Sequence, residues 1–563
     1  MARAPHSAAD RDRPAASLRL PKASIMNVLW IMADQLRWDY LSCYGATHME
    51  TPNLDWLASQ GVRFNKAYVQ SPICGPSRMS YYTGRYVRSH GSTLNGAPLR
   101  VGEPTLGEHL RDHGVKYSLV GKTHMTPDTA GMKRLGIDPT GTIGALMSEC
   151  GFEVVLRDDG ENPTAHPGRK SAAYEAYLRR HGMEGDNLWE EWANTGVTPD
   201  GDLVSGWMLE NSAYPARVSR DHSETAWLTT CGIDYIAAQG DQPWLCHLSY
   251  IKPHWPYMAP APYNDMYSAD DLPPVNRHPA EQDTDHPLLR EWLKSRISRN
   301  FSRDEIRDTV GPVYMGLIKE LDDQLGRLFA FLRETGRMDD TMIVFCADHG
   351  DNMGDHWMGE KDLFYDCSAR VPLLIYDPRQ QADATRGTAS DALVEAIDLA
   401  PTFLDAFDAP AKPHILEGRS LRPILHGTPA PWRDFCVSEY DYATRPARRV
   451  NGIDQADARL VMIFDGRWKY VHVEQMRPLL YDLETDPDEI VDLGGDPRFA
   501  AQIDRMKALH FEWSRQHHTR ITRDPAAVET ATDRGAPPGV LIAYANRSEV
   551  DSDGRIFPTH VQQ

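Results

Sequence analysis

The 563-residue chain contains little cysteine, and what it has is scattered. Its eight cysteines include no CxxC pair, which argues against a disulfide framework. Cys246 and Cys346 stand inside apolar runs, where a cysteine usually behaves as a small hydrophobic residue. We therefore expect a protein of a reducing compartment, the cytoplasm.

Long apolar runs and an excess of basic charge are missing as well. No run approaches the ~18 residues of a membrane span, and residues 1–24 lack the apolar core of a secretory signal, so we interpret them as a disordered leader. Acidic residues outnumber basic ones 80 to 60, for a formal net charge of -20. This balance argues against nucleic acid and anionic membranes as partners. An anionic ligand would need a local cluster of cations.

Short apolar runs alternate with helical patterns, which is typical of an α/β fold with a large, mostly parallel central sheet flanked by helices. A helix is predicted over 53–61, with Asn53 as its N-cap and Gly61 just past its end. A longer one over 303–334 repeats leucine at i+3 and i+4 and should pack on the sheet. The clearest strands are 27–34, 117–122, 244–250, 342–348 and 372–378.

The pattern divides the chain into a main domain, residues 25–412, and a smaller α+β subdomain, residues 413–520. The second contains "ARLVMIFDGRWKYVHV" and "LLYDLETDPDEIVDL", alternating runs that predict an antiparallel sheet. The tail, 521–563, has one apolar patch, "GVLIAYA", which we expect to contact a neighbouring subunit in a dimer or tetramer. Two irregular insertions, 124–240 and 257–300, are expected to line the active site.

Polar side chains follow the predicted strands at the points where the strands end. Asp34 and Gln35 end the first strand, and Asp348 and His349 end another. Ligands bind at the carboxyl ends of strands in open α/β sheets, although a single Asp there is more often a helix cap. Two carboxylates, an amide oxygen and an imidazole suit one divalent cation, either calcium or manganese.

Four cationic or titratable residues also leave strand ends or the loops beyond them. Surface lysines and histidines without a function are common, but these four would converge on the same edge of the sheet as the cation. Such a cluster suits a tetrahedral oxyanion. The residues are Lys122, His124, His254 and Lys361.

Cys74, in "SPICGPSR", is a buried spectator, a thiol nucleophile or a precursor of another group. A soft thiolate would fit poorly beside a hard cation. The segment from Cys74 to Arg78, followed by Thr83-Gly84-Arg85, resembles the C-x-P-S-R…T-G-R signature of the type I sulfatases of the alkaline phosphatase superfamily. In that family the cysteine is oxidised to formylglycine, an aldehyde.

The resemblance extends through "GKTH", "KPHWPY" and "ADHGDNMGDHWMGEKDLFYD" to "LYDLETDPDE". It implies an alkaline-phosphatase-like sandwich and a formylglycine-generating enzyme as a partner during maturation. By the resemblance, the metal ligands are Asp34, Gln35, Asp348, His349 and the modified Cys74. The implied catalytic residues are Cys74, Arg78, Lys122, His124, His254 and Lys361.

The resemblance implies hydrolysis of sulfate monoesters, chiefly aryl sulfates, through a formylglycine gem-diol. One hydroxyl would attack, and the other would expel sulfate after His124 takes its proton. Gln35 and His349 resemble phosphonate monoester hydrolases, whereas Lys122 and His124 are typical of sulfatases. The alternative is therefore a phosphonate monoester hydrolase or phosphodiesterase with promiscuous sulfatase activity. A third hypothesis is an anion-binding protein without turnover.

Overall fold

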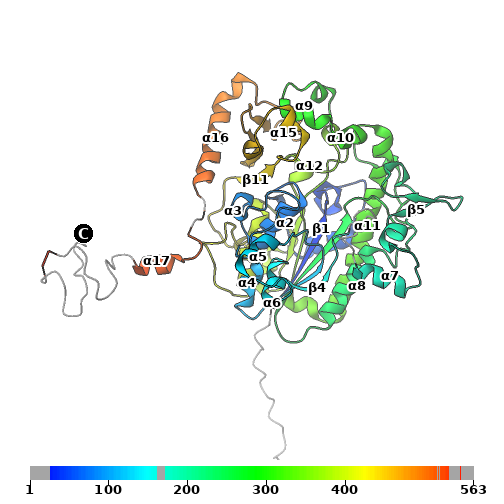
Figure 1. The fold of residues 1–563 in the computed structure, drawn as a ribbon, viewed down its shortest axis with the longest axis horizontal. Helices are drawn as coiled ribbons and strands as arrows, with labels where there is room; N and C mark the ends of the chain where they lie inside the picture. The colour runs from blue at the N-terminus through cyan, green and yellow to red at the C-terminus, as the bar shows by residue number, and fades with distance from the viewer. Residues whose placement is uncertain (1–25, 161–171, 517, 519, 532–544, 547–563) are drawn as a thin grey trace, which may run out of the picture.

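The computed structural model describes residues 26–160, 172–516, 518, 520–531 and 545–546 (Figure 1). The predicted leader, 1–24, lies outside these residues, and so does most of the patch 539–545. The predicted tail is described only at 521–531, which include helix α17 (Pro525–Ala531), and at 545–546. The expected contact of this tail with another subunit stays a prediction.

An eight-stranded sheet forms the centre of the main domain and confirms the predicted α/β architecture. All five strands expected from the sequence are present. One of them, β9, runs antiparallel to both of its neighbours, whereas all the other pairs are parallel. In sheet order the strands are β10 (Thr388–Glu395), β2 (Val62–Tyr68), β9 (Leu373–Tyr376), β8 (Thr341–Ala347), β1 (Asn27–Asp34), β7 (Trp244–Pro253), β3 (Lys116–Gly121) and β4 (Glu153–Arg157).

Helices cover both faces of this sheet (Figure 1). One face carries α1 (Pro52–Gln60), α8 (Glu224–Ala237) and α11 (Asp304–Glu334). The other carries α2 (Cys74–Thr83), α4 (Leu106–Arg111) and α13 (Leu399–Ala406). The predicted leucines of α11 are fully buried, as the periodicity indicated: Leu317, Leu321, Leu325, Leu328 and Leu332.

The predicted N-cap at Asn53 is wrong. Helix α1 begins one residue earlier, at Pro52, with Thr51 as its N-cap residue. Proline suits the first position of a helix because its missing N–H would have no partner there. The free N–H groups of Asn53 and Leu54 donate instead to the carboxylate of Asp322 on α11, at 3.1 and 2.9 Å.

The C-terminal subdomain contains the predicted antiparallel sheet. Its strands, in order, are β11 (Cys436–Asp441), β12 (Arg459–Phe464), β13 (Trp468–Val473) and β14 (Leu479–Asp482). Helix α16 (Ala500–Arg515) packs on one face through Met506 and Trp513. The boundary at residue 413 stays a prediction.

The eight cysteines are all free thiols, in agreement with the absence of a disulfide framework. Cys246 and Cys346 are fully buried in β7 and β8, as expected of small hydrophobic residues. Within the described part of the chain, no helix has both the length and the apolar character that crossing a bilayer requires.

A glycine ends strand β3 where the sheet leaves no room for a side chain. Gly121 has φ +111°, and an added Cβ would collide with the backbone oxygen of Ser249 on β7. We expect Gly121→Ala to lower the free energy of unfolding by about 2 kcal/mol or more, because left-handed strain and overpacking add. Urea denaturation followed by circular dichroism measures this. Gly240→Ala, where a Cβ meets nothing within 4 Å, should leave the midpoint unchanged, and equal midpoints for both variants would contradict the prediction.

Candidate active site

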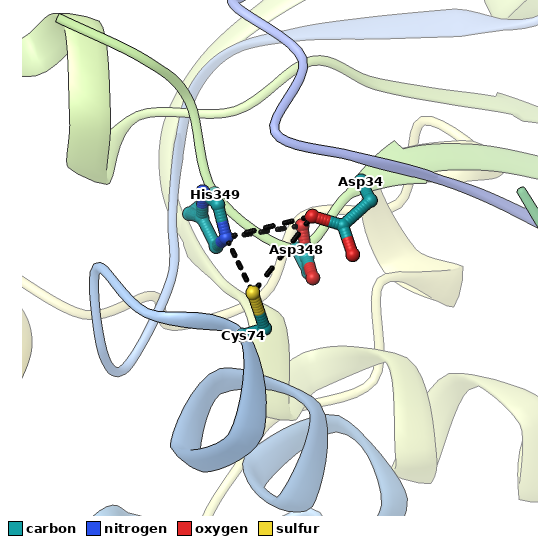
Figure 2. Close-up of side chains that lie close together, drawn as sticks. All are labelled: Asp34, Cys74, Asp348 and His349. Carbon is teal, nitrogen blue, oxygen red and sulfur yellow. Dashed lines mark hydrogen bonds and ion pairs between the residues drawn. The ribbon is translucent and has the colours of Figure 1, made fainter. Parts of the chain in front are cut away.

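Four side chains converge at the carboxyl edge of the central sheet (Figure 2). Asp34 is the last residue of β1, and Asp348 and His349 directly follow β8. Cys74 is the first residue of α2. All four are buried, and their potential ligand atoms lie within 4.8 Å of one another. The strand ends meet here because β1 and β8 are parallel neighbours.

The Arg78 guanidinium lies directly behind this cluster and is fully buried. Its Nε donates to Asp348 Oδ2 at 2.7 Å, and its Nη2 donates to Asp34 Oδ2 at 3.2 Å. Its Nη1 donates to the Lys122 carbonyl oxygen at 2.9 Å and to Ser249 Oγ at 2.8 Å. These contacts orient the Arg78 guanidinium toward the two carboxylates and hold the carboxylates in place. Ser249 stands inside a strand and gave no signal in the sequence.

The Cys74 sulfur marks the position where the family resemblance places the formylglycine oxygen. It lies 3.1 Å from His349 Nε2 and 3.0 Å from Lys361 Nζ. Burial by itself raises the pKa of the Cys74 thiol, but Lys361 and His349 bring that pKa well below its ordinary value. The surroundings therefore stabilise negative charge at residue 74.

His349 has a defined orientation. Its Nδ1 donates to the Gly350 carbonyl oxygen at 2.8 Å, so that Nε2 faces Asp34 Oδ1 and Asp348 Oδ1, each at 3.7 Å. Burial lowers the pKa of His349, but Asp348 and Cys74 raise it above the ordinary value. A hydrogen bond on the other ring nitrogen is the usual way of orienting a metal-binding histidine.

Gln35 is held with its side-chain oxygen toward the same cluster. Its Nε2 donates to Asp351 Oδ2 at 2.5 Å and contacts the Tyr257 hydroxyl at 3.2 Å. Its Oε1 accepts from Lys361 Nζ at 3.2 Å. The sequence analysis missed Asp351 and Tyr257 as supports, although both stand within its quoted motifs, "ADHGD" and "KPHWPY".

The donor set fits one divalent cation. Carboxylate and amide oxygens suit calcium, and an additional imidazole suits manganese too. Burial raises the pKa of Asp34, but neighbouring positive charges, Lys122 and Arg78 among them, lower it far below its ordinary range, so the carboxylate is charged. The residues that would hold the ion are Asp34, Gln35, Asp348 and His349, together with the modified residue 74.

The remaining predicted residues surround the cluster. Lys122 Nζ forms an ion pair with Asp34 Oδ2 at 2.6 Å. Lys361 Nζ lies 3.0 Å from His254 Nε2, which is 4.0 Å from Asp34 Oδ1. His124 is half-buried, and its side chain helps to lower the pKa of Cys74. The structure thus brings every predicted site residue into one group, while their catalytic roles stay predictions.

Lys361 stands in a loop of unusual backbone geometry. Between Met353 and Leu363, six residues other than glycine have positive φ angles, from +46° to +87°. Such conformations are costly and persist only where surrounding contacts impose them. Asp362 Oδ1 accepts hydrogen bonds from Tyr440 and Arg445, both at 2.8 Å. The C-terminal subdomain therefore helps to position Lys361.

His254 has a support that the sequence analysis missed as well. The buried ammonium of Lys252 donates to the carbonyl oxygens of His254 and Pro256, at 3.2 and 2.6 Å. Nothing in the sequence distinguished Lys252 from an ordinary strand-end lysine. Its two contacts fix the backbone on both sides of Trp255, and therefore the direction of the His254 ring.

Known proteins resemble the chain over nearly its whole length. The family model described as Sulfatase matches residues 26–409, and "N-sulphoglucosamine sulphohydrolase, C-terminal" matches residues 354–516. The multifunctional alkaline phosphatase superfamily protein PehA of Trinickia caryophylli is 32% identical over 520 residues, which cover 88% of this chain and 96% of PehA. An arylsulfatase of Clostridium perfringens is 28% identical, over 86% of this chain and 93% of its own.

Two solved structures share the fold. The phosphonate monoester hydrolase of Silicibacter pomeroyi superposes with a TM-score of 0.76 and 30% identity, over 88% of this chain and 97% of that one. The phosphonate monoester hydrolase of Agrobacterium radiobacter gives a TM-score of 0.75 and 32% identity, over 87% and 96%. With its strand-end cluster and the segment Cys74–Arg78, this chain is a member of the sulfatase family, within the alkaline phosphatase superfamily.

Proposed function

We propose that the protein hydrolyses phosphonate monoesters and phosphodiesters most efficiently, and sulfate monoesters, including aryl sulfates, more slowly at the same site. The main support for this proposal is the similarity to two phosphonate monoester hydrolases over 87–88% of this chain. This order reverses the expectation from sequence alone, which ranked sulfate first.

The charges around the reaction centre support substrates with a single negative charge. Gln35 contributes an amide, so Asp34 and Asp348 are the two carboxylates that would share the cation. Lys122 forms an ion pair with Asp34, and Lys361 contacts Cys74. Lys122 and His124 are the pair that resembles sulfatases, and they support a retained sulfatase activity.

The side chains have distinct roles in this proposal. Formylglycine at position 74 would supply a nucleophilic hydroxyl when hydrated, and the bound cation would lower the pKa of that hydroxyl. Arg78 holds the two carboxylates, and Lys122 and Lys361 neutralise the oxygens of the transferred group. His254 and Lys361 share a hydrogen bond, so either can protonate the departing alcohol. His124 accepts a proton from residue 74.

The order of activities is tested with one leaving group. We expect kcat/KM for 4-nitrophenyl phenylphosphonate to exceed that for 4-nitrophenyl sulfate by about tenfold or more, which corresponds to about 1.4 kcal/mol of transition-state stabilisation. A higher value for the sulfate would restore the sulfatase as the main activity. Binding of sulfate without turnover of either ester by protein that carries the aldehyde would favour the anion-binding hypothesis.

The nucleophile is tested by mass spectrometry and mutation. The peptide that contains Cys74 should have lost sulfur and gained an aldehyde oxygen in active protein. Cys74→Ser should fold normally but lose about 1000-fold or more in kcat, because removal of a catalytic nucleophile typically costs at least that much. Cys231→Ser, at a half-buried position on α8, should keep its activity. An intact Cys74 thiol in fully active protein would refute the mechanism.

The metal site is tested by chelation. We expect removal of the cation to abolish turnover and to lower the thermal midpoint, because a ligand bound only to the folded state stabilises it. Addition of calcium or manganese to the stripped protein should restore both, and the ion that restores more identifies the preference. Unchanged midpoint and activity, with elemental analysis showing no bound metal, would exclude the site.

A further inference from the structure

A cavity of about 780 Å³ lies beside the candidate active site. Its volume falls within the range of sites that bind small molecules. The apolar part of its wall includes Trp207, Leu209, Trp255, Ile297, Phe301 and Ile306. Trp207 and Leu209 belong to the insertion 124–240, whereas Ile297 and Phe301 belong to α10 (Arg296–Phe301).

The cavity adjoins the reacting groups through three residues of its wall. The Trp255 ring lies 4.7 Å, centre to centre, from the ring of His254. The Tyr257 hydroxyl donates to Asp351 Oδ2 at 2.8 Å, the oxygen that also holds Gln35. Glu360 directly precedes Lys361. The cavity therefore begins where His254 and Lys361 would protonate the alcohol of the ester.

The walls of the cavity suit an apolar aromatic group better than a charged one. Trp207 and Trp255 lie with ring centres 6.2 Å apart, and Trp207 Nε1 donates to Glu190 Oε1 at 2.6 Å, which fixes the indole. Aromatic groups stack readily on such rings. Met208, also in the wall, is 52% exposed, an apolar surface open to a ligand.

The charged residues of the wall balance in number. The wall contains two acidic residues, Glu210 and Glu360, and two basic ones, Arg296 and Arg303. An alcohol with its own charge would gain from one pair and lose from the other. A neutral alcohol has no such conflict, so the apolar walls decide the preference.

We infer that this cavity binds the alcohol portion of the ester and selects apolar aromatic alcohols. The inference rests on the proposed function, since it assigns the leaving group of the same reaction. It gives Trp207 a role in specificity, separate from the residues that surround Cys74. The irregular insertion that carries Trp207 would thereby determine which esters the enzyme accepts.

Two esters of methylphosphonic acid test the inference. Phenol and 4-phenylphenol have similar acidity, so the phenyl and biphenyl-4-yl esters differ mainly in the apolar area of the leaving group. We expect the wild-type protein to prefer the biphenyl ester by about tenfold in kcat/KM, and Trp207→Ala to reduce this preference to about threefold or less. Trp207→Phe should retain most of it, and Trp192→Ala, outside the cavity, all of it.

A second variant covers the case in which Trp207→Ala does not fold. Met208→Asp changes an exposed side chain and places a carboxylate in the wall of the cavity, so it should raise KM for the biphenyl ester several-fold more than KM for the phenyl ester. Equal preference in the wild type and in both variants, or better turnover of an ester with a quaternary ammonium alcohol, would overturn the inference. Absence of turnover of either ester would instead refute the proposed function. In that case, tighter inhibition by 4-phenylphenol than by phenol in a sulfate ester assay would still support binding of the aromatic alcohol in the cavity.

Discussion

One buried guanidinium connects four adjacent strands. Arg78 binds Asp34 at the end of β1, Asp348 after β8, the carbonyl oxygen of Lys122 after β3, and Ser249 in β7. These strands lie in the order β8-β1-β7-β3, so a single side chain spans the centre of the sheet. An unpaired charge at this depth would cost several kcal/mol. Pairing this charge therefore helps to hold the two carboxylates of the candidate cation site in place beside Cys74.

The C-terminal subdomain completes this centre from the outside. Lys361 contacts Cys74 from a loop whose backbone is strained, and the adjacent Asp362 is bound by Tyr440 of β11 and by Arg445. Local propensity alone would not maintain such a loop, because each residue other than glycine with a positive φ angle costs free energy. The small antiparallel sheet thus helps to position a predicted catalytic residue, in addition to its packing. Its contacts with Asp362 support the loop in which the Lys361 ammonium lies 3.0 Å from the Cys74 sulfur.

Membership in the family leaves the substrate open, because one fold can carry several activities. In the proposed function, the reaction centre selects its substrate by charge, because two carboxylates, an amide and several cations suit an ester with one negative charge, whether it is a phosphonate, a phosphodiester or a sulfate. We infer that the alcohol is recognised elsewhere, in the cavity between Trp207 and α10. In this view, the centre determines the chemistry of the transferred group and the insertion determines the leaving group.

The sequence by itself determined the local features: the buried strands, the leucine face of α11 and the strand-end polar residues, because periodicity and position along a strand are local properties. It also determined the family through the segment Cys74–Arg78. Only the tertiary structure decided which groups support the site. Ser249, Lys252 and Asp351 act through partners from distant parts of the chain, and the antiparallel direction of β9 depends on topology, since a strand buried on both faces has the same composition in either direction.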